Sequence, residues 1–180
     1  MKILCLVLCI CFFSSCGSKD ILKTKDISNS ITQTEVIFNS DINEIEDFEY
    51  FFENFSPSFI VPGLFEGVIP QGICYNSLTD RYIISNYYEN GEYPSVITIV
   101  NASTGKLEKS LFLQYSDGTD YTGHAGGITC SDDHIYISSD SQCFTISIEA
   151  IISAENLESV KFESNFKLNT KGSFAAYSDG

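Results

Sequence analysis

Short runs of apolar residues that favour strands follow Pro62, and residues typical of turns separate the runs. The first pair of runs covers residues 71–76 and 82–85, and a similar pair covers residues 126–131 and 135–138. These runs are rich in isoleucine and tyrosine, which favour extended strands. They predict β-strands joined in hairpins.

Each pair of runs continues into a larger unit. In the first unit, a third strand is predicted at residues 95–100 and an outer strand at residues 107–113. The turn between them, residues 101–106, has Gly105 where a hairpin needs a positive φ. In the second unit, the third strand, a short helix and the closing strand are predicted at residues 143–148, 149–155 and 160–168.

A third copy of the unit begins at residues 172–179. The copies recur roughly every 50 residues, which is the period of a four-stranded propeller blade. We therefore expect an all-β fold in which residues 61–180 form a partial β-propeller, with two complete blades and the start of a third. A closed propeller needs at least about four blades, so we expect an N-terminal fragment of a longer protein. The alternative is a complete, small, open β-sheet domain.

The hairpin at residues 95–113, with its Asn-x-x-Thr-Gly-Lys turn, resembles the outer hairpin of bacterial propellers with YVTN and pyrroloquinoline-quinone-type repeats. Over residues 61–180 the pattern also resembles exported bacterial propeller proteins with no assigned biochemical role and, distantly, the gluconolactonase-like propellers. The resemblance implies the fold. It carries over no catalytic residue, because the metal-binding Glu, Asn and Asp of the lactonase group have no matching motif here.

The first sixteen residues combine the parts of an export signal. Lys2 precedes an apolar run from Ile3 to Phe13, and the small residues Ser14 and Ser15 lead to Cys16. This arrangement resembles the lipobox of bacterial lipoproteins, in which the cysteine is acylated and becomes the mature N-terminus. It implies a signal peptide at residues 1–15, a lipid on Cys16, and anchoring on the extracytoplasmic face of the cell membrane or outer membrane. A plain secretory signal is the alternative.

Composition divides the region between the signal and the repeats. Residues 16–40 are mostly polar and predict a flexible tether, although the alternation at residues 31–38 also fits one strand. Residues 41–60 form a lead-in segment whose pattern fits either a helix or a strand.

The net charge of the chain excludes one class of partner. The chain has 10 lysine and arginine residues against 24 aspartate and glutamate residues, a formal net charge of -14. Such a chain repels phosphate backbones, so we expect no nucleic-acid partner.

Beyond the signal and its lipid site the cysteines are Cys74, Cys130 and Cys143. Because each lies in an apolar run we expect three buried thiols, with one disulfide and a spare thiol as the alternative.

Polar residues precede or open the predicted innermost strands. Gln71, His124 and Ser173 occupy this place in successive copies, so in a closed propeller they converge on one mouth of the central channel. The imidazole of His124 suits a metal or a proton transfer, and it equally suits a hydrogen bond that fixes a loop. His134 follows a turn and is expected to be exposed.

Signatures of known catalysts are missing from the sequence. Gly-x-Ser-x-Gly, P-loop and His-Glu-x-x-His motifs do not occur, nor does an Asp-rich calcium loop, so we expect no cofactor. Tyrosines near strand ends suit contacts with sugars or peptides, and they equally suit packing between blades. They are Tyr82, Tyr87, Tyr88, Tyr93, Tyr115 and Tyr121.

Together these patterns predict a lipid-anchored binding module for an envelope or extracellular ligand, which is a glycan, a peptide or a protein. The alternative is a metal-assisted hydrolase of the lactonase or esterase type, with a divalent metal and His124 at the channel mouth.

Overall fold

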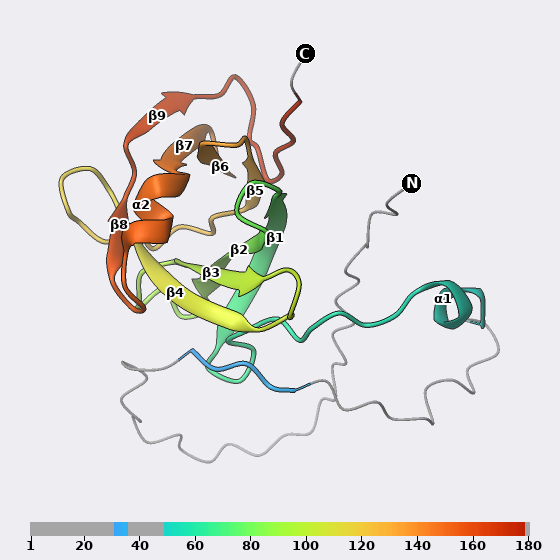
Figure 1. The fold of residues 1–180 in the computed structure, drawn as a ribbon. Helices are drawn as coiled ribbons and strands as arrows, with labels where there is room; N and C mark the ends of the chain where they lie inside the picture. Colours follow the sequence, from blue (N-terminus) through green and yellow to red (C-terminus); the bar gives the residue numbers. More distant parts are fainter. Residues whose placement is uncertain (1–30, 36–48, 179–180) are drawn as a thin grey trace, which may run out of the picture.

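A computed structural model of the protein describes residues 31–35 and 49–178 (Figure 1). These residues form two β-sheets and two short helices, so the predicted all-β class is confirmed. The predicted signal peptide, the predicted lipidation site at Cys16 and most of the predicted tether lie outside the described residues.

The first sheet contains the four strands predicted for the first unit. They are β1 (Val68–Asn76), β2 (Arg81–Tyr88), β3 (Val96–Asn101) and β4 (Leu107–Gln114), each antiparallel to the one before. Gly105 has a φ of 67° in the β3–β4 turn, as predicted. A side-chain turn supports it, because Asn101 Oδ1 accepts a hydrogen bond from the Thr104 backbone N–H at 2.9 Å.

The second sheet is ordered β5-β6-β7-β9. Its strands are β5 (Gly127–Cys130), β6 (His134–Ser139), β7 (Gln142–Ser147) and β9 (Ser164–Lys167). The helix predicted after the third strand is confirmed as α2 (Ile148–Ser153), and the Ser147 hydroxyl caps it by accepting a hydrogen bond from the Ala150 N–H.

One prediction for the second unit is wrong. Residues 160–168 were expected to form a single closing strand, but β8 (Ser159–Lys161) pairs in parallel with β4 of the first sheet, and only β9 pairs with β7. The exposed edge of β4 explains the division. The Phe112 N–H donates to Glu158 O at 2.9 Å, and Gln114 O accepts from the Phe162 N–H at 2.9 Å, so the segment satisfies that edge first.

The third copy is not a strand. Residues 171–178 have no regular secondary structure, yet they lie against β5. A Cβ built on Gly127 would be 2.3 Å from the Phe174 Cα. Because a Cβ points out of the plane of a sheet, this segment covers the face of β5 and does not join a hydrogen-bonded ladder.

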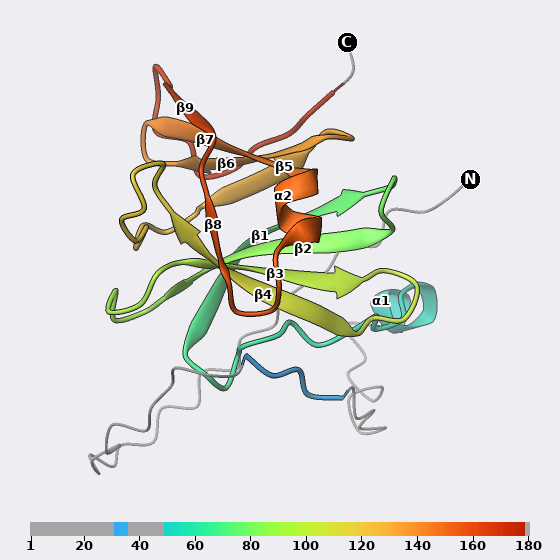
Figure 2. The same ribbon diagram turned by 60° about the vertical axis from the view of Figure 1, so that its left-hand side comes forward.

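The core lies between the two sheets, and α2 covers it from the side (Figure 2). Ile97, Ile99, Ile135, Ile137 and Ile146 are fully buried there. A smaller cluster on the other face of the first sheet contains Val68, Tyr88 and Val96, with Ile31, Tyr93 and Phe112 packed against it.

The sequence of the lead-in segment, residues 41–60, fits either a helix or a strand. Its described part contains a helix, α1 (Glu49–Asn54). Residues 31–35, the described part of the alternative strand at 31–38, form no strand.

Candidate functional site

The strands β1 and β5 lie side by side although they belong to different sheets. A Cβ on Gly72 would be 3.1 Å from the Ile128 backbone nitrogen, which shows how closely the two strands approach. At their far ends, Asn76 Nδ2 donates to Ser131 O at 2.9 Å. The strands therefore run in the same direction, and the loops that lead into them lie at one end of the molecule.

Gln71 lies at this end because of a β-bulge. Pro70 pairs with Asn86 and Gly72 with Ser85, so Gln71 has no partner on β2. A bulge bends the strand and redirects the side chain of the extra residue. The Gln71 side chain is half-buried, and its Nε2 donates to Pro70 O at 3.1 Å.

His124 is exposed at the same end and stacks on an aromatic ring. Its imidazole lies nearly parallel to the Tyr87 ring, with the centroids 4.4 Å apart and an interplanar angle of 10°. Tyr87 pairs with Ile69 at the start of β1, so the stack joins the first sheet to the loop that leads into β5. The histidine of this stack is exposed to solvent.

The buried side chain of Tyr121 fixes the loop that carries His124. Burial of this tyrosine raises the pKa of its hydroxyl, which is hydrogen-bonded to the Ser139 side chain and the Ala125 backbone. Gly123 lies so close to the ring that a Cβ there would be 2.4 Å from the Tyr121 Oη. The Tyr121 carbonyl also accepts from the Ser95 N–H at 2.6 Å. These contacts fix the loop that carries His124, and none of them involves the imidazole itself.

Ser173 is the third predicted site residue, and it is exposed. It lies beside the same loop, because a Cβ on Gly126 would be 3.4 Å from the Ser173 Cα. Gln71, His124 and Ser173 thus gather at one end of the described structure. The three side chains form no hydrogen bond with one another there.

Two other expectations need correction. His134 was expected to be exposed in a turn, but it is the half-buried first residue of β6, held between Asp133 (Nδ1 to Oδ1, 3.1 Å) and Glu163 (Nε2 to Oε2, 3.4 Å). Cys143 is buried as expected, whereas Cys74 and Cys130 are only half-buried. They lie on β1 and β5, whose shared face is not completely covered.

The carboxylate of Asp117 has a structural role in a turn. Asp117 Oδ1 accepts hydrogen bonds from the Thr119 N–H and hydroxyl, which lowers the pKa of its carboxyl group. Within residues 31–35 and 49–178, no group of three or more histidine, cysteine or acidic side chains could hold a metal ion.

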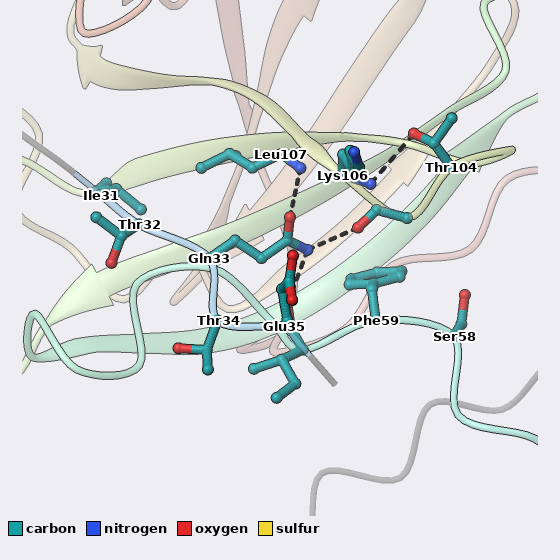
Figure 3. A pocket seen from close by; sticks show the side chains of 12 residues that line it. Ile31, Thr32, Gln33, Thr34, Glu35, Ser58, Phe59, Thr104, Lys106 and Leu107 are labelled. Carbon is teal, nitrogen blue, oxygen red and sulfur yellow. Dashed lines mark hydrogen bonds between the residues drawn. The ribbon is translucent and has the colours of Figure 1, made fainter. Parts of the chain in front are cut away.

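A cavity of about 570 Å³ lies elsewhere, between residues 31–35, 58–60 and 104–107 (Figure 3). The Gln33 side chain crosses it. Its Nε2 donates to Gly105 O at 2.7 Å and Ile60 O at 3.1 Å, and its Oε1 accepts from the Leu107 N–H at 2.6 Å. This amide fixes the N-terminal segment to the β3–β4 turn, a role that the sequence pattern did not predict.

No family model matches the chain, and a search of curated proteins found no match. In the part of the chain that the structure describes, no helix is long and apolar enough to cross a membrane.

Proposed function

We propose that this chain is part of a lipid-anchored, extracytoplasmic β-propeller that binds carbohydrate at the end where Gln71, His124 and Ser173 gather. The observation that carries the proposal is the exposed stack of His124 on Tyr87. Aromatic faces are suited to the apolar faces of sugar rings, and polar groups beside them are suited to sugar hydroxyls.

The arrangement of the inner strands supports the propeller. Glycine allows β1 to approach β5 closely at Gly72, and it allows β5 to approach the third copy closely at Gly127. The same kind of contact therefore recurs from one unit to the next, as expected for blades arranged around an axis.

The chemistry of the site supports an uncharged ligand. Gln71 offers an amide and Ser173 a hydroxyl, and both donate and accept hydrogen bonds. The net charge of -14 opposes polyanions, so neutral glycans fit best.

The site is tested by replacing His124 with alanine. The probes are neutral oligosaccharides, with uncharged short peptides as the comparison class, and binding is measured by calorimetry. For the probe that binds the unaltered protein, we expect His124→Ala and Tyr87→Ala each to weaken binding about tenfold, because each removes half of the stack.

His134→Ala is the matched control. His134 is the first residue of β6 and lies at the end of the β5–β6 pair that is distant from His124, so its loss should leave affinity unchanged. Equal affinities of His124→Ala and the unaltered protein would reject this site. Binding of peptides in place of all the carbohydrates would reject the ligand class.

The anchor is tested separately at Cys16. We expect Cys16→Ser to abolish incorporation of labelled palmitate and to release the protein from the membrane fraction, because the acylated thiol is gone. Cys11→Ser, within the apolar run of the signal, should retain the label. Unchanged membrane association of Cys16→Ser would contradict lipid anchoring.

A further inference from the structure

Two thiols meet where the inner strands of the two sheets lie side by side. Cys74 is on β1 and Cys130 on β5, and each lies two residues beyond the point where Gly72 approaches the Ile128 backbone nitrogen. Cys130 Sγ donates to the carbonyl oxygen of Tyr75, the residue after Cys74, at 3.3 Å. The two cysteines are therefore neighbours across the junction of β1 and β5. Both thiols also pack against the main core, which restrains their relative positions.

We propose that Cys74 and Cys130 are a thiol pair that oxidation converts into a disulfide joining β1 to β5. The geometry suits this reaction because the two cysteines lie on adjacent strands that run in the same direction, and both pack against the same core cluster. Cys143 is excluded from the pair, since it is buried on β7.

The surroundings give the two thiols different roles. The hydrogen bond from Cys74 lowers the pKa of Cys130 and raises the pKa of Cys74, and the nearby carboxylate of Asp132 opposes the first of these effects. Cys130 also lines a small cavity of about 110 Å³ with Tyr75, Asp132 and Tyr177. Cys130 is therefore the thiol that meets an oxidant first, because it is both reachable and the more acidic.

The oxidant is a low-molecular-weight disulfide. The Cys130 thiolate attacks one of its sulfur atoms, forms a mixed disulfide and releases the first small thiol. Cys74 then loses its proton and attacks the Cys130 sulfur, which releases the second small thiol. Two protein thiols have been oxidised, and the small disulfide has accepted two electrons and two protons.

The disulfide would change how firmly the two sheets are held together. The strands β1 and β5 belong to separate sheets, so side-chain contacts such as that of Asn76 with Ser131 hold them together. A disulfide adds a covalent link at this junction and closes a long loop between positions 74 and 130, which restricts the unfolded chain.

The test treats the full chain with oxidised glutathione and maps its peptides by mass spectrometry. Among the peptides that contain Cys74, Cys130 and Cys143, we expect one cross-linked pair, that of Cys74 and Cys130, with the loss of two hydrogen atoms. The melting temperature should rise on the order of 10 °C and return to its starting value after reduction.

Cys143→Ser should behave like the unaltered chain. Cys74→Ser should instead stop at a glutathione adduct on Cys130, with no rise in melting temperature. Three outcomes would overturn the proposal: two free thiols after treatment, a stable adduct on Cys130 of the unaltered chain, or a disulfide that includes Cys143.

Discussion

Replacing Phe162 with alanine is expected to lower the free energy of unfolding by about 3 to 5 kcal/mol, as for other buried phenylalanines. The side chain is 3% exposed. Its ring stacks on Phe144 with the centroids 4.3 Å apart, and it meets the edge of Tyr121 at 5.1 Å. Phe162 also lies in the link between β8 and β9, which runs from one sheet to the other (Figure 2). Its loss leaves a cavity in the core between the sheets.

Chemical denaturation measures this effect, and Phe166→Ala is the matched control. Phe166 belongs to the same segment but is 51% exposed on β9, so its loss should change the free energy of unfolding by no more than about 0.5 kcal/mol. Equal effects of the two substitutions would show that Phe162 does not join the sheets as described.

Replacing Gly127 with alanine is expected to detach residues 172–177 from β5 and to cost about 2 kcal/mol. The added Cβ would lie 2.3 Å from the Phe174 Cα and 2.6 Å from its carbonyl carbon. Both are backbone atoms, so no change of side-chain rotamer relieves the overlap. The hydrogen bond from the Tyr177 N–H to Thr129 Oγ1, at 3.0 Å, should be lost with the segment.

Two measurements follow the segment directly. The Tyr177 amide should exchange its hydrogen faster, and trypsin should cut sooner after Lys171, which precedes the detached residues. Gly126→Ala is a graded control, because its Cβ would meet no atom closer than the Ser138 carbonyl oxygen at 3.3 Å. Slow exchange at Tyr177 in Gly127→Ala would contradict the close approach.

The local pattern of the sequence determined most of the strands. Short runs rich in β-branched and aromatic residues, with turn residues between them, identified β1 to β4 and β5 to β7, because such residues favour an extended and buried strand whatever its neighbours are. The turn at Gly105 and the cap at Ser147 are equally local, since each depends on a backbone geometry set within a few residues.

The repeat carried information about the candidate site. Gln71 opens its predicted strand and His124 precedes the equivalent strand of the next copy, so their places in the repeat predicted that they lie toward the same end of the molecule. The partner of His124 was not predictable in this way. Tyr87 was one of several tyrosines near strand ends, and only the fold distinguishes it from the buried Tyr88 and Tyr121.

Tertiary structure alone decided which edge or face each segment meets. Residues 160–168 have an apolar pattern that suits one strand, but the unsatisfied edge of β4 takes the first part as β8. Gln33 binds a turn far along the chain, and Cys130 of the second sheet donates to the Tyr75 carbonyl of the first. Periodicity records whether a residue is buried, and not what covers it, because the covering atoms come from parts of the chain that the local pattern does not contain.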